Sequence, residues 1–404
     1  MGSRGNSLFA YVSRLCYNPI SSQITLNSTL PNPESGFSFL ARNFAARDDR
    51  FQGAFRILEN AISVRTFPAC SLAITFRGEL VANRALGHFT YDPASPGITT
   101  ASLFDLASLT KVVATTTMAM ILYERGLLDL EAPITAIVPE FAGALTESDS
   151  PRRSVTLRML LVHSSGLPAY EKLFLRTQTR DDLLQAAFAT SLTAAPEERT
   201  EYSDIGFIIL GIALARLADE PLDVFCQREI FGPLGMTHTT FNPAAALKSS
   251  IVPTADDRSF RHRIIQGEVQ DENASILGGV AGHAGLFSTA DDLAVFAHAM
   301  LNGGHPILRA STVELFSRRE STPDGTSRAL GWDTPSAPSQ SGKYFSSRSY
   351  GHLGYTGTSL WIDPERRLSI SLLTNRTWPD CQNQAIKQVR PAFHDAVIEA
   401  LENA

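Results

Sequence analysis

Hydrophobic and polar positions follow patterns that predict helices and strands at both ends of the chain. Apolar residues recur at helical spacing within residues 47–65, which predicts an amphipathic helix. Residues 70–76 and 80–86 are β-prone runs separated by a tight turn, so we expect a β-hairpin there. Towards the other end, residues 358–362 and 368–374 form a second pair of β-prone runs. The two ends therefore supply strands that can pair in one sheet.

The middle of the chain carries helical patterns separated by loops. A Thr before an apolar run and a Gly after it predict a capped helix at 156–163. Further helices are expected at 127–137, 181–189, 207–218, 222–231, 291–301 and 384–402. Because most of these helices lie between the two strand pairs, we expect an α+β fold. It would have an antiparallel sheet flanked by helices, an inserted all-helical unit, and a cleft between them.

The same pattern predicts the domain boundaries. Residues 1–44 are rich in Ser, Asn and Pro, and we expect them to form a loosely ordered leader. Residues 45–119 and 276–404 would form the sheet unit, and residues 120–275 the mainly helical insertion. A chain of 404 residues is long enough for two such units.

Composition narrows the classes of function. A net charge of -6 argues against binding to nucleic acid or to an anionic membrane surface. No window holds eighteen uninterrupted apolar residues, so we expect no membrane span. Ser13 and Arg14 interrupt the apolar part of the N-terminus, which makes it a poor signal peptide. We therefore expect a cytoplasmic protein, or a periplasmic one if the true start lies upstream.

No cofactor is predicted from the pattern of ligand-type residues. The four cysteines fit neither a redox pair nor a zinc-ligand spacing, and we interpret them as free thiols. The chain has neither an HExxH motif nor another clustered ligand set, so a metal is not expected. The Gly-rich run at 278–285 lacks the Gly-Lys-Ser/Thr of a phosphate loop.

Ser108 and Lys111 form the first candidate for chemistry. Residues three positions apart lie on one face of a helix, which puts the lysine amine within reach of the serine hydroxyl. A serine becomes a useful nucleophile when a neighbouring base takes its proton, and Lys111 is set in apolar sequence where a solvated lysine would be unusual. The alternative interpretation is a helix lysine that extends to solvent.

Two further motifs could supply partners for Ser108. Tyr202-Ser-Asp204 precedes an apolar helix, so it is either a simple helix cap or a phenol that relays a proton to Ser108. Residues 350–358 alternate Gly with polar residues ahead of a strand, which permits close approach of backbone to a ligand. His352 in this run is either a substrate contact or a histidine in a surface turn.

Together these motifs resemble the serine β-lactamase and penicillin-binding-protein superfamily. Ser-x-x-Lys, then Tyr-Ser-Asp about ninety residues later, then His-x-Gly before a late strand, is most similar to its class C β-lactamase-related branch. That branch includes family VIII esterases, D-aminopeptidases and D-Ala-D-Ala carboxypeptidases. The stretches 160–168, 273–289 and 357–364 also resemble it, and the resemblance covers roughly residues 45–400.

The resemblance implies a role for each matching residue. Ser108 would be the acylated nucleophile, Lys111 its immediate proton partner, and Tyr202 the group that helps deprotonate Ser108 and later activates water. The backbone N–H groups of Ser108 and Tyr355 would form the oxyanion hole. The substrate-binding residues would be Asp204, His352 and Gly354.

Two departures from the family pattern bear on the substrate. Asp204 stands where Asn is frequent, and it adds a negative charge near Lys111. His352 replaces the Lys common in true β-lactamases, giving a weaker and pH-dependent hold on a substrate carboxylate. Both favour an esterase or peptidase acting on a small ester, amide or peptide, including D-amino-acid or peptidoglycan-derived substrates. The alternatives are a β-lactamase, a non-catalytic penicillin-binding sensor, and a structural protein with coincidental motifs.

Overall fold

The computed structural model describes residues 40–42, 48–143 and 151–402. Residues 1–39 and 43–47 lie outside the described residues, and they include most of the leader predicted at 1–44. Within the described part, six strands form the main sheet in the order β1-β3-β2-β11-β10-β9. Every neighbouring pair is antiparallel except β1 and β3, which run parallel. The strands are β1 (Ala41–Arg42), β2 (Ala69–Phe76), β3 (Glu79–Gly87), β9 (Tyr350–Leu353), β10 (Ser359–Asp363) and β11 (Leu368–Thr374).

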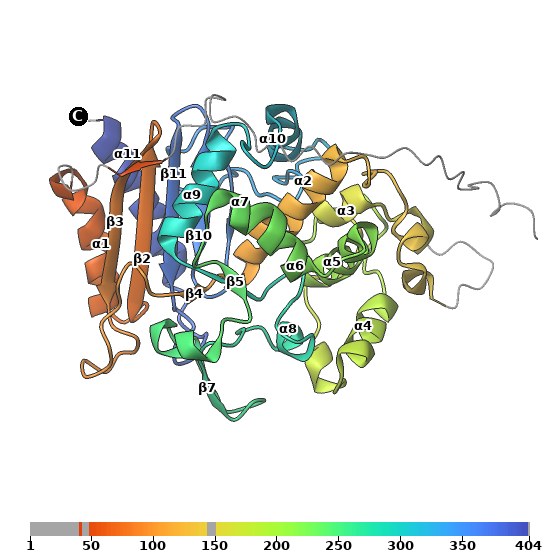
Figure 1. Cartoon of the computed structure of the whole chain (residues 1–404), viewed down its shortest axis with the longest axis horizontal. Coiled ribbons are helices and arrows are strands. Elements are labelled where there is room, and N and C mark those ends of the chain that lie inside the picture. The colour runs from red at the N-terminus through yellow and green to blue at the C-terminus, as the bar shows by residue number, and fades with distance from the viewer. Residues whose placement is uncertain (1–39, 43–47, 144–150, 403–404) are drawn as a thin grey trace, which may run out of the picture. The chain divides into compact units, whose positions relative to one another are not determined.

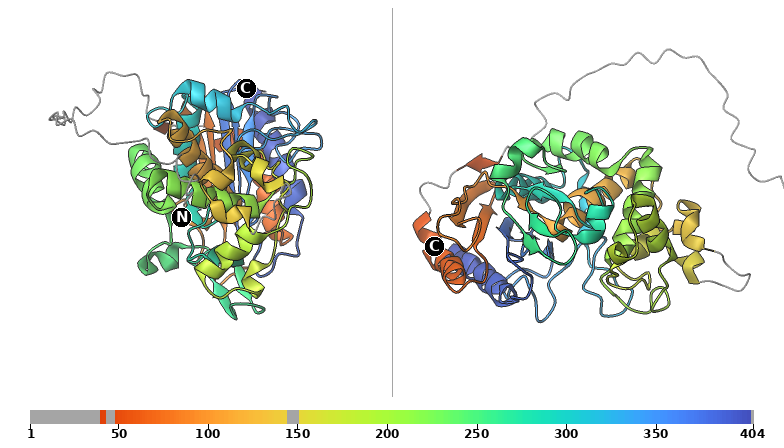
Figure 2. Two further views of the ribbon diagram at one scale, coloured as in Figure 1. Left: turned by 90° about the vertical axis from the view of Figure 1, so that its right-hand side faces the viewer. Right: turned by 90° about the horizontal axis from the view of Figure 1, so that it is seen from below.

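The sheet joins the two ends of the chain as the strand patterns predicted. Strand β2 pairs with β11 over its length, so that Leu72 faces Leu372. Alternate residues of β2 point to opposite faces: Leu72 and Ile74 enter one apolar core, and Ala73 enters the other. Helices α1 (Gln52–Ser63) and α11 (Ile386–Glu402) cover the first face, and α9 (Ala290–Leu301) covers the second (Figures 1 and 2). The α+β expectation is confirmed.

Helices and short strands occupy the chain between β3 and β9 (Figure 1). Helix α5 is almost wholly apolar and buried at its centre. The helices are α2 (Thr117–Glu124), α3 (Leu157–Leu161), α4 (Arg180–Ala189), α5 (Asp204–Ala218), α6 (Leu222–Cys226), α7 (Gly232–Leu234), α8 (Glu272–Ile276) and α10 (Ala310–Ser317). The short strands are β4 (Phe104–Asp105), β5 (Thr240–Phe241), β6 (Ala255–Asp257), β7 (Arg263–Ile265) and β8 (Leu286–Ser288).

One predicted helix was wrong. Residues 127–137 form only a short 3-10 turn, Ile134–Ala136. Pro133 has no N–H to donate, and it instead forms a β-bridge with Thr156, while the N–H of Ile134 donates to the carbonyl of Val155 (2.8 Å). Hydrogen bonding to a distant segment thus replaces the helix that the apolar spacing predicted.

The division into a sheet unit and a helical insertion stays a prediction. A large apolar core contains residues from α5, α9 and the sheet, so the helical segment and the sheet are packed together. Among the described helices, none is long and apolar enough to cross a bilayer.

Candidate active site

The backbone around Ser108 is irregular. Strand β4 ends at Asp105, a 3-10 turn spans Ala107–Leu109, and a π-helix, Lys111–Thr116, leads into α2. Ala107 has φ +46°, a left-handed conformation that a residue with a Cβ adopts at a cost of about 1–2 kcal/mol. Its N–H donates to Oδ1 of Asp105 at 2.8 Å, which holds this turn in place. Ser108 follows directly, so its position depends on the strained turn.

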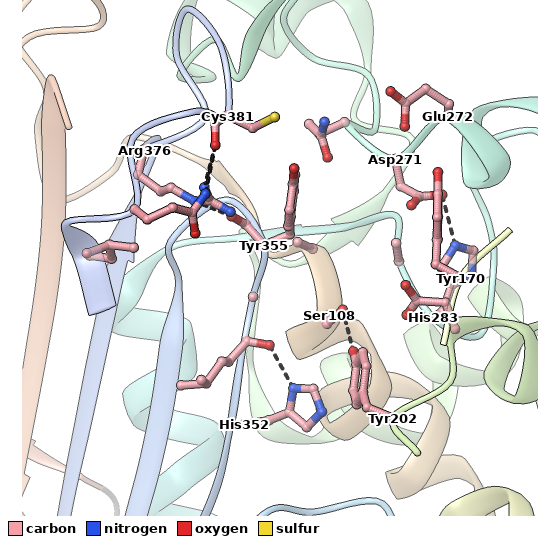
Figure 3. Close-up of a pocket in the computed structure, with 18 of the residues that line it drawn as sticks. Ser108, Tyr170, Tyr202, Asp271, Glu272, His283, His352, Tyr355, Arg376 and Cys381 are labelled. Atoms are coloured by element: carbon pink, nitrogen blue, oxygen red, sulfur yellow. Dashed lines mark hydrogen bonds and ion pairs between the residues drawn. The ribbon is translucent and has the colours of Figure 1, made fainter. Parts of the chain in front are cut away.

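The structure brings Ser108, Lys111 and Tyr202 into mutual contact. Lys111 Nζ donates to Ser108 Oγ at 3.0 Å. The Tyr202 hydroxyl donates to the same oxygen at 2.8 Å, as Figure 3 shows. Lys111 Nζ also lies 4.9 Å from the centre of the Tyr202 ring. A hydroxyl, an amine and a phenol therefore share protons at one place, as the resemblance implied for these residues.

Lys111 is fully buried and held as an ammonium ion. Its Nζ forms an ion pair with Oδ1 of Asp204 at 2.6 Å and donates to the carbonyl of His283 at 3.1 Å. Burial alone would lower the pKa of Lys111, but the Asp204 carboxylate and Tyr202 outweigh it, and the net shift is upward. The cation then stabilises negative charge on its neighbours, because it does not give up its own proton easily.

Tyr202 is positioned by His163. The N–H of Ser203 donates to His163 Nδ1 at 3.0 Å, and the rings of His163 and Tyr202 lie 4.6 Å apart. Burial, with Arg328 and Lys111 nearby, holds the pKa of His163 well below its ordinary value, so the imidazole stays neutral and accepts this bond. The sequence motifs did not indicate this contact between His163 and the segment of Tyr202. No local spacing links it to Tyr202, almost forty residues away.

Burial raises the pKa of Tyr202, and the positive charge of Lys111 opposes that rise. The phenol is therefore protonated at neutral pH, and it becomes a base only when Lys111 offsets the cost of its negative charge. The positive charge of Lys111 thus lies beside Tyr202, where it favours the ionised phenol.

His352 lies on β9, the last strand in the order of the described sheet. Its Nδ1 donates to the carbonyl of Leu353 at 2.8 Å, which leaves Nε2 as an acceptor with no partner among the described residues. Burial, together with Lys111 and Arg328, holds the pKa of His352 well below its ordinary value. His352 is therefore neutral at physiological pH and suited to accept a hydrogen bond, rather than to attract a carboxylate by charge.

Gly354 allows the connection after β9 to lie against the segment before Ser108. A Cβ at this position would lie 2.5 Å from the carbonyl oxygen of Leu106 and 1.9 Å from Oγ1 of Thr358. Thr358 also donates to the Leu106 carbonyl at 2.9 Å. This close approach brings the backbone of Tyr355 beside the Ser108 turn, where the resemblance places the oxyanion hole. The oxyanion role of these N–H groups stays a prediction.

Ser108, Tyr202, His352, Gly354 and Tyr355 line a cavity of about 750 Å³. Figure 3 shows Ser108 and Tyr202 in its lower part, with Arg376 and Cys381 on one side and Asp271 and Glu272 on the other. Charged side chains are numerous on its walls. The cationic ones are Lys172, Arg328, Arg376, Lys387 and Arg390, and the acidic ones are Asp204, Asp271, Glu272 and Asp333.

Sequence reasoning missed the cationic side of this cavity. Arg376 Nε donates to the carbonyl of Tyr355 at 2.7 Å, and its guanidinium lies over the Tyr355 ring at 4.5 Å. Arg390 is buried and donates to the carbonyl of Thr358 at 3.3 Å. Within the described part of the chain, neither arginine forms an ion pair. Their positive charges are therefore not neutralised within the described residues and line the cavity. No sequence motif indicated this cationic wall.

Comparison with known proteins identifies the family. The β-lactamase family profile matches residues 48–390, and the chain belongs to this family of serine hydrolases. It is 32% identical to an N-acetylmuramyl-L-alanine amidase of Bacillus subtilis over 346 residues, 77% of each protein. It is 31% identical to a putative D-alanyl-D-alanine carboxypeptidase of Escherichia coli over 343 residues, 77% of this chain and 79% of the relative.

Solved structures show the same fold at lower identity. EstCE1, a hydrolase with promiscuous acyltransferase activity, superposes with a TM-score of 0.70 at 20% identity, covering 87% of this chain and 98% of that one. Unliganded simvastatin synthase of Aspergillus terreus superposes with a TM-score of 0.68 at 20% identity, covering 88% of this chain and 100% of its own. The β-lactamase/transpeptidase-like fold that the resemblance implied is confirmed.

Proposed function

We propose that this serine hydrolase forms an acyl-enzyme on Ser108 and cleaves an amide in a peptide that carries a free carboxylate. One observation supports the chemistry above all others: the Ser108 hydroxyl lies within hydrogen-bond distance of both Lys111 Nζ and the Tyr202 phenol, and it lines an open cavity. A nucleophile, its activating charge and a proton acceptor are thus in contact before any substrate binds.

The geometry supports the following order of events. Tyr202, as the phenolate stabilised by the Lys111 ammonium, takes the Ser108 proton while Oγ attacks the carbonyl carbon. The tetrahedral intermediate collapses, and Tyr202 returns the proton to the departing amine, leaving the acyl group esterified to Ser108. Water then attacks the ester, Tyr202 accepts its proton, and the released Ser108 recovers that proton as the acid leaves.

The nucleophile can be tested by covalent labelling. Incubation with a fluorophosphonate probe, followed by digestion and mass spectrometry, is expected to find the label on Ser108. Ser108→Ala should abolish labelling and hydrolysis. Ser259→Ala is the matched control, because Ser259 lines the same cavity but its hydroxyl donates to Asp257 (3.3 Å). Label on another residue, or full activity in Ser108→Ala, would contradict the proposal. Acylation without product release would favour the sensor alternative.

The substrate class is supported by the relatives and by the charge of the cavity. Two of the relatives above 30% identity are named as an N-acetylmuramyl-L-alanine amidase and a putative D-alanyl-D-alanine carboxypeptidase. Arg376, Lys387 and Arg390 line the cavity, and no ion pair among the described residues neutralises them. An anionic group on the substrate would supply the missing charge, which a neutral short-chain ester does not.

Lys387 gives a test of this charge match. Lys387→Gln is expected to raise KM about 10-fold for carboxylate-bearing amides such as N-acetylmuramyl-L-alanine or a D-Ala-D-Ala peptide, because one charge-assisted contact is lost. KM for a neutral p-nitrophenyl ester should not change. Lys343→Gln, an exposed lysine that does not line the cavity, is the control. Equal effects on both substrates would contradict the charge match, and faster turnover of nitrocefin than of the amides would favour the β-lactamase alternative.

A further inference from the structure

A buried carboxylate connects the Ser108 turn to one wall of the cavity. Asp105 is 1% exposed, and its two oxygens accept from two different segments. Oδ1 accepts from the N–H of Ala107 at 2.8 Å, and Oδ2 accepts from the N–H of Gln270 at 2.6 Å. The residue before the nucleophile and a residue 165 positions away in the chain are therefore held by the same side chain.

The wall segment is also connected to Lys111. Asp271, the neighbour of Gln270, contacts His283 Nε2 through Oδ1 at 2.9 Å. The carbonyl of His283 accepts from Lys111 Nζ at 3.1 Å, and Nζ donates to Ser108 Oγ. These contacts form a closed ring. It runs from Ser108 through its neighbour Ala107 to Asp105, then through residues 270–271 to His283, and returns to Ser108 through Lys111. We refer to it as the positioning ring.

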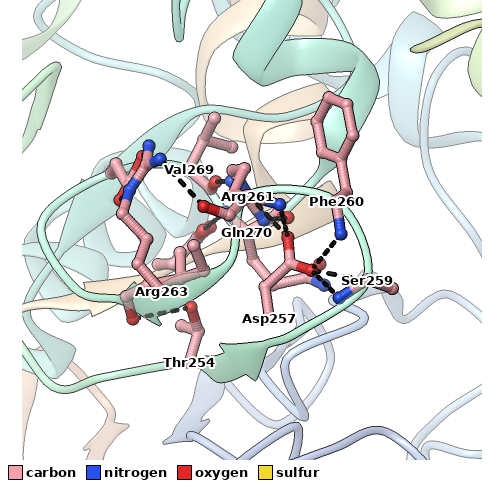
Figure 4. A network of polar contacts seen from close by, with 11 residues as sticks. Thr254, Asp257, Ser259, Phe260, Arg261, Arg263, Val269 and Gln270 are labelled. Atoms are coloured by element: carbon pink, nitrogen blue, oxygen red, sulfur yellow. Dashed lines mark hydrogen bonds and ion pairs between the residues drawn. The ribbon is translucent and has the colours of Figure 1, made fainter. Parts of the chain in front are cut away.

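The wall segment itself is rigidly held. Arg261 donates through Nη1 to the carbonyl of Val269 and through Nη2 to that of Gln270, each at 2.7 Å (Figure 4). Its Nε donates to Asp257 at 2.9 Å. Because Gln270 is fixed on both sides of its peptide, it can serve as an anchor for Asp105.

We propose that Asp105 is a positioning residue, which sets Ser108 relative to Lys111 by joining the strained Ala107 turn to the wall at residues 270–271. This inference rests on the proposed function and extends it to residues that do not touch the reacting atoms. Burying a carboxylate is costly, and a neutral residue would be cheaper for stability alone. The structure instead retains a group with two acceptor oxygens, the number that the Ala107 and Gln270 N–H groups require.

The positioning ring should respond to pH. Burial raises the pKa of Asp105 to about 6, Asp271 adds to that rise, and the two N–H donors and Arg261 oppose it. When Asp105 takes a proton, one of its oxygens becomes an O–H donor that faces an N–H group, so one of the two bonds is lost. The Ser108 turn would then be released from the wall as the pH falls through about 6.

Asp105→Asn tests the proposal, since asparagine has one acceptor oxygen at nearly the same shape. We expect kcat for a p-nitrophenyl ester to fall about 10- to 100-fold at pH 8 with KM changed less than about two-fold, because a small displacement of the nucleophile affects the chemical step. The ratio of wild-type to variant kcat should be largest at high pH and fall towards one as the pH drops through about 6 and further, because residue 105 then becomes neutral in the wild type as it already is in the variant. Taking the ratio cancels every other titrating group that they share.

Asp92→Asn is the matched control, because Asp92 is exposed and accepts from the N–H two residues on (Ala94, 2.9 Å) as Asp105 does. It should leave kcat unchanged. A kcat within two-fold of wild type for Asp105→Asn, or a loss that is independent of pH, would overturn the proposal. Fluorophosphonate labelling of wild-type Ser108 is measured in parallel, so that a failed positioning ring is distinguished from a failed nucleophile.

A second variant keeps the test decisive if Asp105→Asn does not fold. Asp271→Asn weakens the opposite side of the positioning ring, at His283, and should also lower kcat. If both variants fold, the double variant should lose less than the product of the two single losses, because both act through one wall segment. Multiplicative losses in the double variant, or full kcat in Asp271→Asn, would contradict the ring.

Discussion

At the scale of single residues, the pairing of Lys111 with Asp204 decides how Ser108 is activated. A buried lysine would lose its proton readily if it stood alone, and it could then act as the base itself. Here Asp204 lies 2.6 Å from Nζ, and the pKa of Lys111 is raised rather than lowered. We therefore propose Tyr202 as the base, with the lysine supplying the positive charge that favours its ionised form.

Asp204→Asn should shift the pH dependence of activity towards lower pH. The Asp204 carboxylate raises the pKa of both Lys111 and Tyr202, so removing its charge lowers both. The rise of kcat/KM with increasing pH should then occur at lower pH than in the wild type, measured with a neutral p-nitrophenyl ester. If the rise of kcat/KM occurs at the same pH as in the wild type, or at a higher pH, the assignment of Tyr202 as base is contradicted.

The same change should cost stability at neutral pH. The folded-state pKa of Lys111 lies above its unfolded value, so its ionised form stabilises the fold at every pH below about 10.5, and this contribution is lost as pH rises through the folded pKa. Removing the carboxylate leaves a buried cation with neutral partners, which costs about 3 kcal/mol. Urea unfolding at pH 7 measures this loss, and it should diminish above pH 10.5.

The residues that we propose for the chemistry could be predicted from sequence, but the residues proposed to position them could not. Ser108, Lys111 and Tyr202 lie in short motifs whose order along the chain is distinctive, and the structure places all three in contact. Asp105 and His163 act instead through single hydrogen bonds to backbone N–H groups far along the chain. Such a bond requires only a carboxylate or an imidazole at the right place in space, so it leaves no pattern in the sequence.

At the scale of structural elements, the connection between β9 and β10 must approach β4 closely to complete the site. Thr356 donates to the carbonyl of Asp105 at 2.8 Å, and Thr358 donates to that of Leu106 at 2.9 Å. Two threonines thus join the turn after β9 to the segment before the nucleophile. The connection also requires glycine at position 354, because a side chain there would overlap the Leu106 carbonyl.

Gly354→Ala should therefore separate these elements. The added Cβ would displace either Thr358 or the Leu106 backbone, at a cost of about 1–3 kcal/mol. The same displacement moves Tyr355 away from Ser108, and we expect kcat to fall about 100-fold. Thermal unfolding and ester hydrolysis measure the two effects.

Gly53→Ala in α1, where a Cβ meets nothing within 4 Å, is the control, and it should leave kcat unchanged. Wild-type kcat in Gly354→Ala would show that the close approach is not needed.

At the scale of the whole molecule, the described fold depends on pairing between the two ends of the chain. Strands β2 and β3 come from the first hundred residues, and β10 and β11 come from the last fifty. The alternation of apolar residues predicted these strands, and their separation along the chain predicted one sheet. The parallel strand β1 was not predicted, because its two residues are exposed and carry no apolar alternation.

The sheet separates the site from one of the two large apolar cores in the described residues. Ser108 and Lys111 lie on the side of α9 and the inserted helices, whose core includes Leu106, Leu109 and Phe207. The second core lies between the sheet and the pair α1 and α11, and it holds Leu58 and Phe393. Ile386 of this core also lines the cavity, but Leu58 does not, so loss of packing at Leu58 weakens the support of the sheet away from Ser108.

Leu58→Ala should thus reduce stability but not catalysis. Leu58 is fully buried in α1, and its truncation leaves a cavity that costs about 3 kcal/mol. The midpoint of urea unfolding should fall, while kcat and KM of the folded enzyme at 20 °C stay within about two-fold of wild type, because no contact of Ser108, Lys111 or Tyr202 involves this core. Glu59→Ala, the exposed neighbour on α1, should change neither property. A kcat that falls in Leu58→Ala under conditions where the protein is fully folded would show that the second core is coupled to the site.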